Sequence, residues 1–396
     1  MRAGELESLR ERIAASPDAI LVMVVLVIFM DMMIYGLLIP IFPQYASSLS
    51  VEESVLGVIF GLYAAMLLVF SIPMGLLSDR LGRRPLIVVG MLLLALATAL
   101  FGLSSTVLHL AAARTVQGIS AAATWSAGLA LIADTCDPAR LGEKMGIALS
   151  SVGLGTVLGP VAGGLLFEYA GYTATFILPA ILAAVIGLLV LAVPVRTPRR
   201  ESPHLLPRGA LPNLAVCAAV IVAVSGTYGV IDPYLPVHLY AAFSASPGMI
   251  GGMFAVLAAA AIIAQPAAGR IYDRCGGSRY LIPGGLVLAG AATLAAVEAE
   301  TILITAVSVF VLGVGLGSAL VPVMPVLAEI YRSHGSQGAA YGIYNTFYSA
   351  GLSAGPFAGA VVLARWALPT LFLLLAVILA AAGVLCWSAI GRAGWR

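Results

Sequence analysis

Twelve long apolar segments divide this chain of 396 residues, and they restrict its fold more than any other feature. A helix needs roughly 20 mostly apolar residues to cross a bilayer. Only 10% of the residues are charged, against about 25% in a soluble domain. The sequence therefore predicts an all-α membrane protein with spans at 19–45, 53–77, 85–103, 107–134, 141–168, 172–194, 211–237, 247–271, 280–297, 301–330, 337–363 and 367–390.

Three short motifs occur twice in the same order, which indicates that one half of the chain duplicates the other. The offsets are 194 (273 − 79), 193 (233 − 40) and 196 (351 − 155). Duplicated membrane halves are typical of secondary transporters, whose substrate site lies between them. The repeated motifs are Asp79-Arg80 with Asp273-Arg274, Pro40-x-x-Pro43 with Pro233-x-x-Pro236, and Gly155-x-x-x-Gly159-Pro160-x-x-Gly163 with Gly351-x-x-x-Gly355-Pro356-x-x-Gly359.

The basic residues predict how the chain is oriented. If the N-terminus is cytoplasmic, 18 of the 20 basic residues fall on the cytoplasmic side, with Arg365 in an outer loop and Arg114 inside a span. This bias predicts that both termini are cytoplasmic, in a plasma (inner) membrane. The expected parts are a cytoplasmic N-terminal segment at 1–18, six-helix halves at 19–194 and 211–390, a linker at 195–210 and a tail at 391–396.

Several classes of function find no support in the sequence. Cys136, Cys217, Cys275 and Cys386 are scattered singly, without metal-ligand spacing, and no nucleophile–base set or phosphate loop is present. The net charge of +2 reflects topology and gives no sign of nucleic-acid binding. We expect no enzyme activity, no cofactor other than a coupling proton, and a monomer in the lipid bilayer.

Asp31 is the strongest candidate for a functional residue. It lies roughly 12 residues into the first span, about 18 Å deep, and ionisable groups inside a membrane mark pathways or relays. Burial favours a neutral carboxylic acid, so Asp31 is expected to hold either a proton or a cationic amine. Arg114, in the fourth span, is expected to tune Asp31 by pairing with it, with a backbone carbonyl or with Gln117. Structural roles for both residues remain open.

A second group of candidates combines one acid with aromatic side chains. Asp232 is either a further coupling acid or the N-cap of a helix, because Pro233 follows it. Aromatic faces attract ammonium groups, so this group is interpreted as lining for a cationic substrate, with simple packing as the alternative. Its members are Tyr35, Trp125, Tyr228, Tyr341, Tyr344, Asn345 and Tyr348.

Two motifs are expected to control gating. In the loop 75–85, Gly75 and Gly82 permit a tight turn, and Asp79, Arg80 and Arg83 supply a charged latch that Asp273 and Arg274 repeat. In the fifth span, the small-residue run formed by Gly155, Gly159, Pro160 and Gly163 suits one helix rocking against another. The alternatives are a purely topogenic loop and plain close packing.

These motifs carry a family resemblance. Gly75-x-Leu77-Ser78-Asp79-Arg80-x-Gly82-Arg83-Arg84 looks like the signature loop of the major facilitator superfamily. Arg114-x-x-Gln117-Gly118 resembles its fourth-helix motif in proton-coupled members, and the 155–164 run resembles its antiporter motif. Asp31 with Pro40 and Pro43, Met145 to Leu149, and Asp232-Pro233 are similar to the vesicular monoamine transporter branch.

The resemblance implies a proton-coupled antiporter that exports a cationic or amphipathic organic compound by alternating access. The chain departs from the monoamine branch at Leu320 and Asn345, where that branch carries acidic groups. The alternative is a facilitator or proton symporter of the same fold for a small neutral or anionic metabolite.

Overall fold

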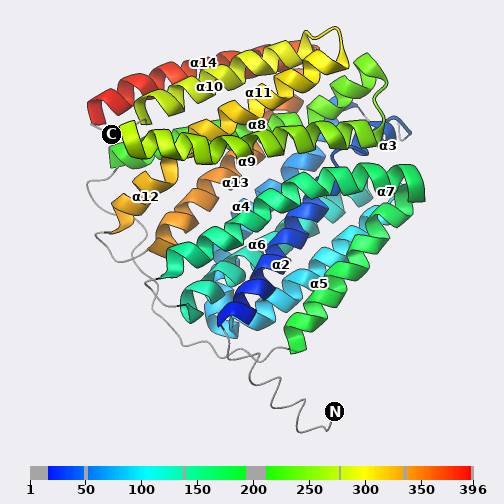
Figure 1. The fold of residues 1–396 in the computed structure, drawn as a ribbon. Coiled ribbons are helices and arrows are strands. Elements are labelled where there is room, and N and C mark those ends of the chain that lie inside the picture. The colour runs from blue at the N-terminus through cyan, green and yellow to red at the C-terminus, as the bar shows by residue number, and fades with distance from the viewer. Residues whose placement is uncertain are drawn as a thin grey trace. The chain divides into compact units, whose positions relative to one another are not determined.

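In a computed structural model of the chain, the described residues are 17–48, 52–136, 140–192, 211–275, 278–332 and 337–393. The expected linker at 195–210, residues 1–16 of the expected N-terminal segment and residues 394–396 of the expected tail lie outside them. These residues form helices and contain no strand. The helices are α2 (Pro17–Leu37), α3 (Phe42–Ser48), α4 (Glu53–Leu81), α5 (Arg83–Gly102), α6 (Val107–Thr135), α7 (Leu141–Ala192), α8 (Leu211–Phe243), α9 (Pro247–Cys275), α10 (Ser278–Val297), α11 (Ile302–Leu320), α12 (Val323–Arg332), α13 (Gln337–Leu363) and α14 (Leu368–Ala393) (Figure 1).

The all-α membrane fold predicted from the sequence is confirmed. Within the described ranges, 11 helices are long and apolar enough to cross a membrane. One of them includes 49 residues and corresponds to two predicted spans. The backbone breaks between these at Gly171, where φ is +79°, a conformation that glycine adopts without steric strain.

Proline and glycine shift three predicted boundaries. The first span ends at Leu37 and a separate short helix, α3, follows, because proline removes a backbone donor and disfavours helix at the preceding residue. Pro322 likewise separates α11 from α12. The expected loop at 75–85 is wrong: α4 continues to Leu81 and the turn is confined to Gly82, where φ is +96°.

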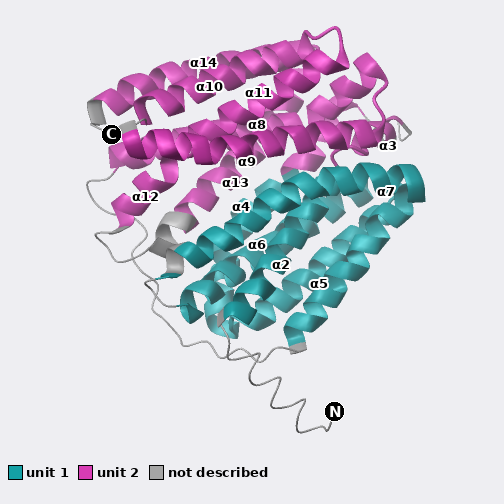
Figure 2. Cartoon of the chain, viewed as in Figure 1, with its two compact units in different colours: residues 1–38, 62–202 teal, residues 39–61, 203–396 magenta. Residues whose placement is uncertain are grey.

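The chain divides into two compact units (Figure 2). Unit 1 contains residues 1–38 and 62–202, and unit 2 contains 39–61 and 203–396. The boundary therefore falls inside α4, so that its first residues pack with α8 and α13 in unit 2. A Cβ atom at Gly57 would lie 2.5 Å from the Pro356 carbonyl oxygen, so only a glycine fits beside α13 at this position.

Glycines at every fourth position bring α7 against α2 in unit 1. A Cβ atom at Gly159 would lie 2.5 Å from the Met33 carbonyl oxygen, closer than real Cβ contacts. One at Gly163 would lie 2.3 Å from the Leu37 oxygen. Because these positions recur at the spacing of one helical turn, they form a continuous seam along the half of α2 that follows Asp31.

The same arrangement recurs in unit 2, between α13 and α8. A Cβ atom at Gly355 would lie 2.4 Å from the Gly226 carbonyl oxygen. Gly355 is also the duplicate of Gly159, so the repeated glycine motif forms a repeated helix contact. This close approach fixes α2 in unit 1 and α8 in unit 2, the helices that carry Asp31 and Asp232.

Candidate functional site

A buried carboxylate with an uneven set of partners lies in unit 1. Asp31, in the middle of α2, is 0% exposed. The Tyr63 hydroxyl of α4 donates a hydrogen bond to Asp31 Oδ2 at 3.0 Å, and the Trp125 indole N–H of α6 donates to the same oxygen at 2.8 Å. Three helices therefore converge on one carboxylate oxygen.

The second oxygen of this carboxylate differs from the first. Asp31 Oδ1 is buried and has no hydrogen-bond partner among the described residues. An unsatisfied buried acceptor is costly and requires an explanation. A proton bound to the carboxylate, or a cation that offers N–H donors, would remove that cost. The carboxylate is thus arranged with one fixed oxygen and one oxygen available for a ligand.

A buried arginine lies next to this carboxylate. Arg114 of α6 is 0% exposed, and its Nη1 donates to Gln117 Oε1 at 2.8 Å. Arg114 and Gln117 are three residues apart, about one helical turn, so the Gln117 amide lies beside the guanidinium on the same face of α6. Of the partners expected for Arg114, Gln117 is the one that this hydrogen bond identifies.

Aromatic rings surround the guanidinium. Arg114 Cζ lies 5.1 Å from the ring centroid of Tyr35, 5.4 Å from Phe101 and 5.9 Å from Tyr63. Such cation–π contacts stabilise a desolvated guanidinium by about 2 kcal/mol. Tyr63 contacts Arg114 with its ring and Asp31 with its hydroxyl, so this one side chain links the buried cation to the buried anion.

The glycine of the fourth-helix motif explains how Tyr63 reaches this position. A Cβ atom at Gly118 would lie 2.3 Å from the Tyr63 carbonyl oxygen, so glycine allows α4 and α6 to touch there. Sequence reasoning found Asp31, Arg114, Tyr35 and Trp125 but missed Tyr63 and Phe101. Tyr63 is the only tyrosine of its span, a signal that could have selected it.

A second acidic and aromatic cluster lies in unit 2, on α8 and α13. Asp232 is 6% exposed and lies inside α8, with Pro233 and Pro236 also within that helix; it is therefore not the cap of a helix start. Tyr348 lies within electrostatic range of Tyr344, Tyr228 and Asp232, and the rings of Tyr344 and Tyr348 are stacked at 5.9 Å.

The other substrate candidates lie on the same helix. Asn345 is partly exposed on α13. Tyr341 belongs to α13, but its side chain lies outside the described residues. The predicted stripe of Tyr344, Asn345 and Tyr348 is therefore present on one helix, and its role in binding stays a prediction.

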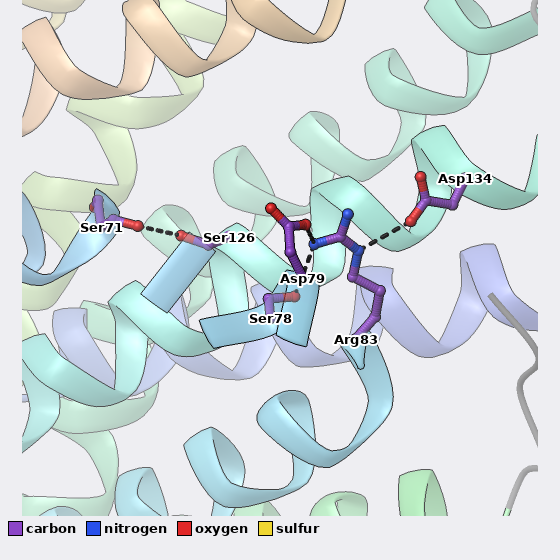
Figure 3. A network of polar contacts seen from close by, with 6 residues as sticks. All are labelled: Ser71, Ser78, Asp79, Arg83, Ser126 and Asp134. Carbon is purple, nitrogen blue, oxygen red and sulfur yellow. Dashed lines mark hydrogen bonds and ion pairs between the residues drawn. The ribbon is translucent and has the colours of Figure 1, made fainter. Parts of the chain in front are cut away.

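A charged network joins the ends of three helices in unit 1 (Figure 3). Arg83, at the start of α5, donates from Nε to Asp134 Oδ2 of α6 at 2.9 Å and from Nη1 to the Ser78 hydroxyl at 3.0 Å. It also forms an ion pair with Asp79 of α4. Arg80 is exposed, and a Cβ atom at Gly75 would meet nothing within 4 Å.

Among the residues that the structure describes, the second copy of this motif makes no such network. Asp273 and Arg274 are exposed at the end of α9, and no ion pair joins either to another residue of the described ranges. The offset of 194 places Gly277 at the position equivalent to Arg83 (277 − 83), so the central cation is missing from the sequence of this copy. A gating role for the second copy stays a prediction.

The small-residue run of the fifth span contacts α2 closely. A Cβ atom at Gly155 would lie 2.9 Å from the Phe29 carbonyl oxygen, and Pro160 Cδ would lie 2.7 Å from a Cβ atom at Gly36. Close packing, the alternative interpretation of this motif, is thus present, and rocking of the helices stays a prediction. Among the described residues, no group of three or more His, Cys, Asp and Glu side chains could hold a metal ion.

The long apolar helices define a multi-pass membrane protein, with Asp31 and Arg114 buried inside it. The sequence model of the Major Facilitator Superfamily matches residues 24–218 and again 217–393. The chain therefore belongs to the Major Facilitator Superfamily and is a transporter rather than an enzyme. This confirms the superfamily resemblance found in the motifs.

Relatives connect the chain to the vesicular amine branch. The MFS-type transporter SLC18B1 of Rattus norvegicus is 28% identical over 350 residues, covering 83% of this chain and 76% of the relative. The chromaffin granule amine transporter of Rattus norvegicus is 28% identical, covering 83% and 64%. The MFS-type transporter ppzB of Metarhizium rileyi is 33% identical over 199 residues, covering 48% of this chain and only 41% of that relative.

Solved structures share the fold. A bacterial homolog of the human lysosomal transporter Spinster, in an inward-facing and occupied conformation, matches with a TM-score of 0.80 at 16% identity, covering 95% of this chain and 97% of that one. The human organic anion transporter MFSD10 matches with a TM-score of 0.67 at 19% identity, covering 94% and 99%.

Proposed function

We propose that this transporter is a proton-coupled antiporter that exports a cationic or amphipathic organic compound by alternating access. The observation that carries the proposal is the Asp31 carboxylate, which is fully buried with two donors on Oδ2 and no described partner on Oδ1. One acid that binds either a proton or a cation, but not both, is sufficient for exchange. The amine transporters among its relatives make an organic cation the natural substrate class.

Opposing effects act on the Asp31 carboxylate. Burial disfavours a charged carboxylate in general, whereas the hydrogen bonds donated by Tyr63 and Trp125 favour it. Such a balance lets a change in surroundings decide whether the acid is charged. In the proposed cycle, a proton from outside neutralises Asp31, the transporter changes its access, and an organic cation then displaces the proton on the inner side.

The acidic and aromatic cluster of unit 2 has the same chemistry. Asp232 supplies a carboxylate, and Tyr228, Tyr344 and Tyr348 supply ring faces that attract ammonium groups. We assign this cluster to substrate binding as well. The proposal further includes a plasma (inner) membrane location, both termini in the cytoplasm and a monomeric transporter without a cofactor other than the proton.

The test uses purified protein in liposomes that enclose a pH-sensitive dye. With an imposed pH gradient, organic cations, anions and neutral compounds are added in turn to wild type, Asp31→Asn and Glu300→Gln, an exposed acid outside the site. We expect cations to trigger proton movement in wild type and in Glu300→Gln. Asp31→Asn keeps the side-chain volume but cannot exchange a proton, so coupled movement should be lost.

Two results would overturn the proposal. Full pH-driven exchange in Asp31→Asn would exclude Asp31 as the coupling acid. Proton movement in the same direction as an anionic or neutral compound would identify a symporter for a metabolite, which is the alternative left by the sequence.

A further inference from the structure

An arginine and two aromatic side chains meet on the outside of unit 2, where α10 and α14 lie side by side (Figure 1). The Arg279 guanidinium lies over the Trp387 ring, with Cζ 5.1 Å from its centroid. The Tyr280 ring meets the same indole edge-on at 5.4 Å. All three residues are exposed, Tyr280 at 65% and Trp387 at 41%.

The duplicated half shows what an arginine at this position does elsewhere in the chain. Arg279 follows Arg84 by 195 residues (279 − 84), and Trp387 follows Leu191 by 196 (387 − 191). In unit 1, Arg84 donates to the carbonyl oxygens of Val190 and Leu191. Those carbonyls are available because α7 ends at Ala192, and the last carbonyls of a helix lack partners within it.

In unit 2 the corresponding carbonyls are already occupied, although the guanidinium of Arg279 lies 3.9 Å from the position of a Cβ atom at Gly391, in the last turn of α14. The helix α14 continues to Ala393, so the carbonyls of Cys386 and Trp387 are used within the helix instead of being left at its end. Within the described ranges, the guanidinium of Arg279 has a cation–π contact with Trp387 and no hydrogen bond or ion pair. A guanidinium carries five N–H donors, and they remain available for an anion.

The surroundings of Arg279 identify the kind of anion. Further along the same two helices, Val287, Val384 and Leu385 are 44%, 67% and 67% exposed, as expected of a surface that faces acyl chains. Tryptophan and tyrosine prefer the interface of a membrane, where one edge of the ring is apolar and the other wet. Arg279 also lies at the end of α10 that the distribution of basic residues predicts to be cytoplasmic.

We propose that Arg279, Tyr280 and Trp387 form a binding site for the headgroup phosphate of an anionic phospholipid. The guanidinium binds the phosphate oxygens through paired N–H donors, as this group does with phosphates in general. The Trp387 ring holds the guanidinium in place through its cation–π contact. The Tyr280 hydroxyl is a further hydrogen-bond donor for the phosphate. The acyl chains lie along the exposed valine and leucine side chains of α10 and α14.

The test measures quenching of Trp387 fluorescence by brominated lipids. The full chain has 4 tryptophans, and Trp366→Phe with Trp395→Phe leaves Trp387 and the buried Trp125. Adding Trp387→Leu to this background leaves Trp125 as the only tryptophan. Its fluorescence is subtracted to obtain the signal of Trp387. The protein is reconstituted in mixtures of phosphatidylcholine and phosphatidylglycerol in which one lipid is brominated, and their relative binding constants are compared.

We expect phosphatidylglycerol to bind beside Trp387 about five-fold more strongly than phosphatidylcholine, since one basic residue near an anionic surface has an effect of about that size. Arg279→Gln should reduce the ratio to about one, and Arg279→Lys should retain part of it. Arg365→Gln removes an exposed arginine at the opposite end of α14 and should leave the ratio unchanged.

Three results would overturn this site. Equal binding of the two lipids in wild type would show that no anionic headgroup is selected. If Arg279→Gln and Arg365→Gln lower the binding ratio equally, the preference for phosphatidylglycerol arises from the overall charge of the protein and not from this site. Displacement of phosphatidylglycerol by millimolar inorganic phosphate, but not by chloride of equal ionic strength, would assign the site to free phosphate. None of these results depends on a transport assay. The lipid site can therefore fail while the proposed antiport holds, and the reverse.

Discussion

At the scale of single residues, the account depends on how Asp31 is held. Both of its described donors point to Oδ2, from Tyr63 on one helix and Trp125 on another. Fixing one oxygen in this way orients the carboxyl group and leaves Oδ1 without a hydrogen-bond partner among the described residues. Tyr63 also lies against Arg114, so a change in the position of the arginine can reach the acid through one ring.

Tyr63→Phe removes a donor to Asp31 while keeping the ring beside Arg114. A hydrogen bond to a charged group contributes about 1.5–3 kcal/mol, and 1.36 kcal/mol corresponds to one pH unit. The donor stabilises the ionised carboxylate, so its loss favours the protonated form. The pH at half-maximal exchange should therefore rise by about one unit or more, as measured from the pH profile of transport in liposomes.

The control for this prediction is Tyr35→Phe, which also keeps a ring beside Arg114 and removes a hydroxyl from the same region. Its pH profile should move less than that of Tyr63→Phe. An unchanged profile in Tyr63→Phe would mean that the tyrosine is a packing residue and does not control the acid.

At the scale of helices, the glycine seam between α2 and α7 holds the site together. Gly159→Ala would place a methyl group 2.5 Å from the Met33 carbonyl oxygen, and overpacking of this kind costs about 1–3 kcal/mol. Gly146→Ala, on the same helix, meets nothing within 4 Å and gains helix propensity. Thermal unfolding in detergent should show a lower midpoint for Gly159→Ala and an equal or higher one for Gly146→Ala.

If the two variants unfold at the same temperature, α2 and α7 are not packed as closely as described here. The matching substitution in unit 2, Gly355→Ala, gives a second measurement, because its Cβ atom would lie 2.4 Å from the Gly226 carbonyl oxygen. It should destabilise the protein by a similar amount.

The Arg83 network predicts a measurable coupling between helices. Arg83 and Asp134 are only 12% and 7% exposed, so solvent screens their hydrogen-bonded ion pair less than a surface pair. In a double-mutant cycle of Arg83→Gln and Asp134→Asn, the effects on the free energy of unfolding should be non-additive by about 0.5–3 kcal/mol.

The exposed pair of Arg140 and Glu143 is the reference for this cycle. Its side chains are 60% and 52% exposed, and exposed pairs typically contribute about 0–1 kcal/mol. Strict additivity for Arg83 and Asp134, or a coupling no larger than in the Arg140 cycle, would contradict the network drawn in Figure 3.

Local sequence rules predicted the helices better than the contacts between them. Hydropathy located the spans, and prolines explain where the first and tenth were drawn too long. The helical extent of 75–81 was missed because the glycine and charges there are also typical of a loop. Tyr63 and Phe101 were missed because they join Arg114 from other helices, and no local spacing encodes which helices will pack together.

At the scale of the whole molecule, the two halves repeat the same helices and glycine contacts but differ in the charged side chains at corresponding positions. Arg83 anchors a network in unit 1, whereas the second half has Gly277 at an offset of 194 (277 − 83) and Ser278 at an offset of 195 (278 − 83), and neither is basic. Arg84 donates hydrogen bonds to the carbonyl oxygens of Val190 and Leu191 near the end of α7. Arg279, 195 residues later, is exposed and contacts the Trp387 ring instead. The duplication therefore fixes where residues lie within a half, and individual substitutions decide what each half does there.

The distribution of basic residues makes a prediction about topology. With 18 of the 20 on one side, fluorescent proteins that mature only in the cytoplasm should fluoresce when fused to either the N-terminus or the C-terminus in bacterial cells. A fusion placed in the outer turn near Arg365 should remain dark. Fluorescence from one terminus only would require an odd number of spans and would contradict twelve.

The most direct test of the central claim measures proton release when substrate binds. Purified protein in weakly buffered detergent is mixed with an organic cation that drives exchange in liposomes, and pH is followed with a dye. The account predicts close to one proton released per bound cation in wild type, because both compete for Asp31, and none in Asp31→Asn. Cation binding without proton release in wild type, or equal release in the variant, would contradict it.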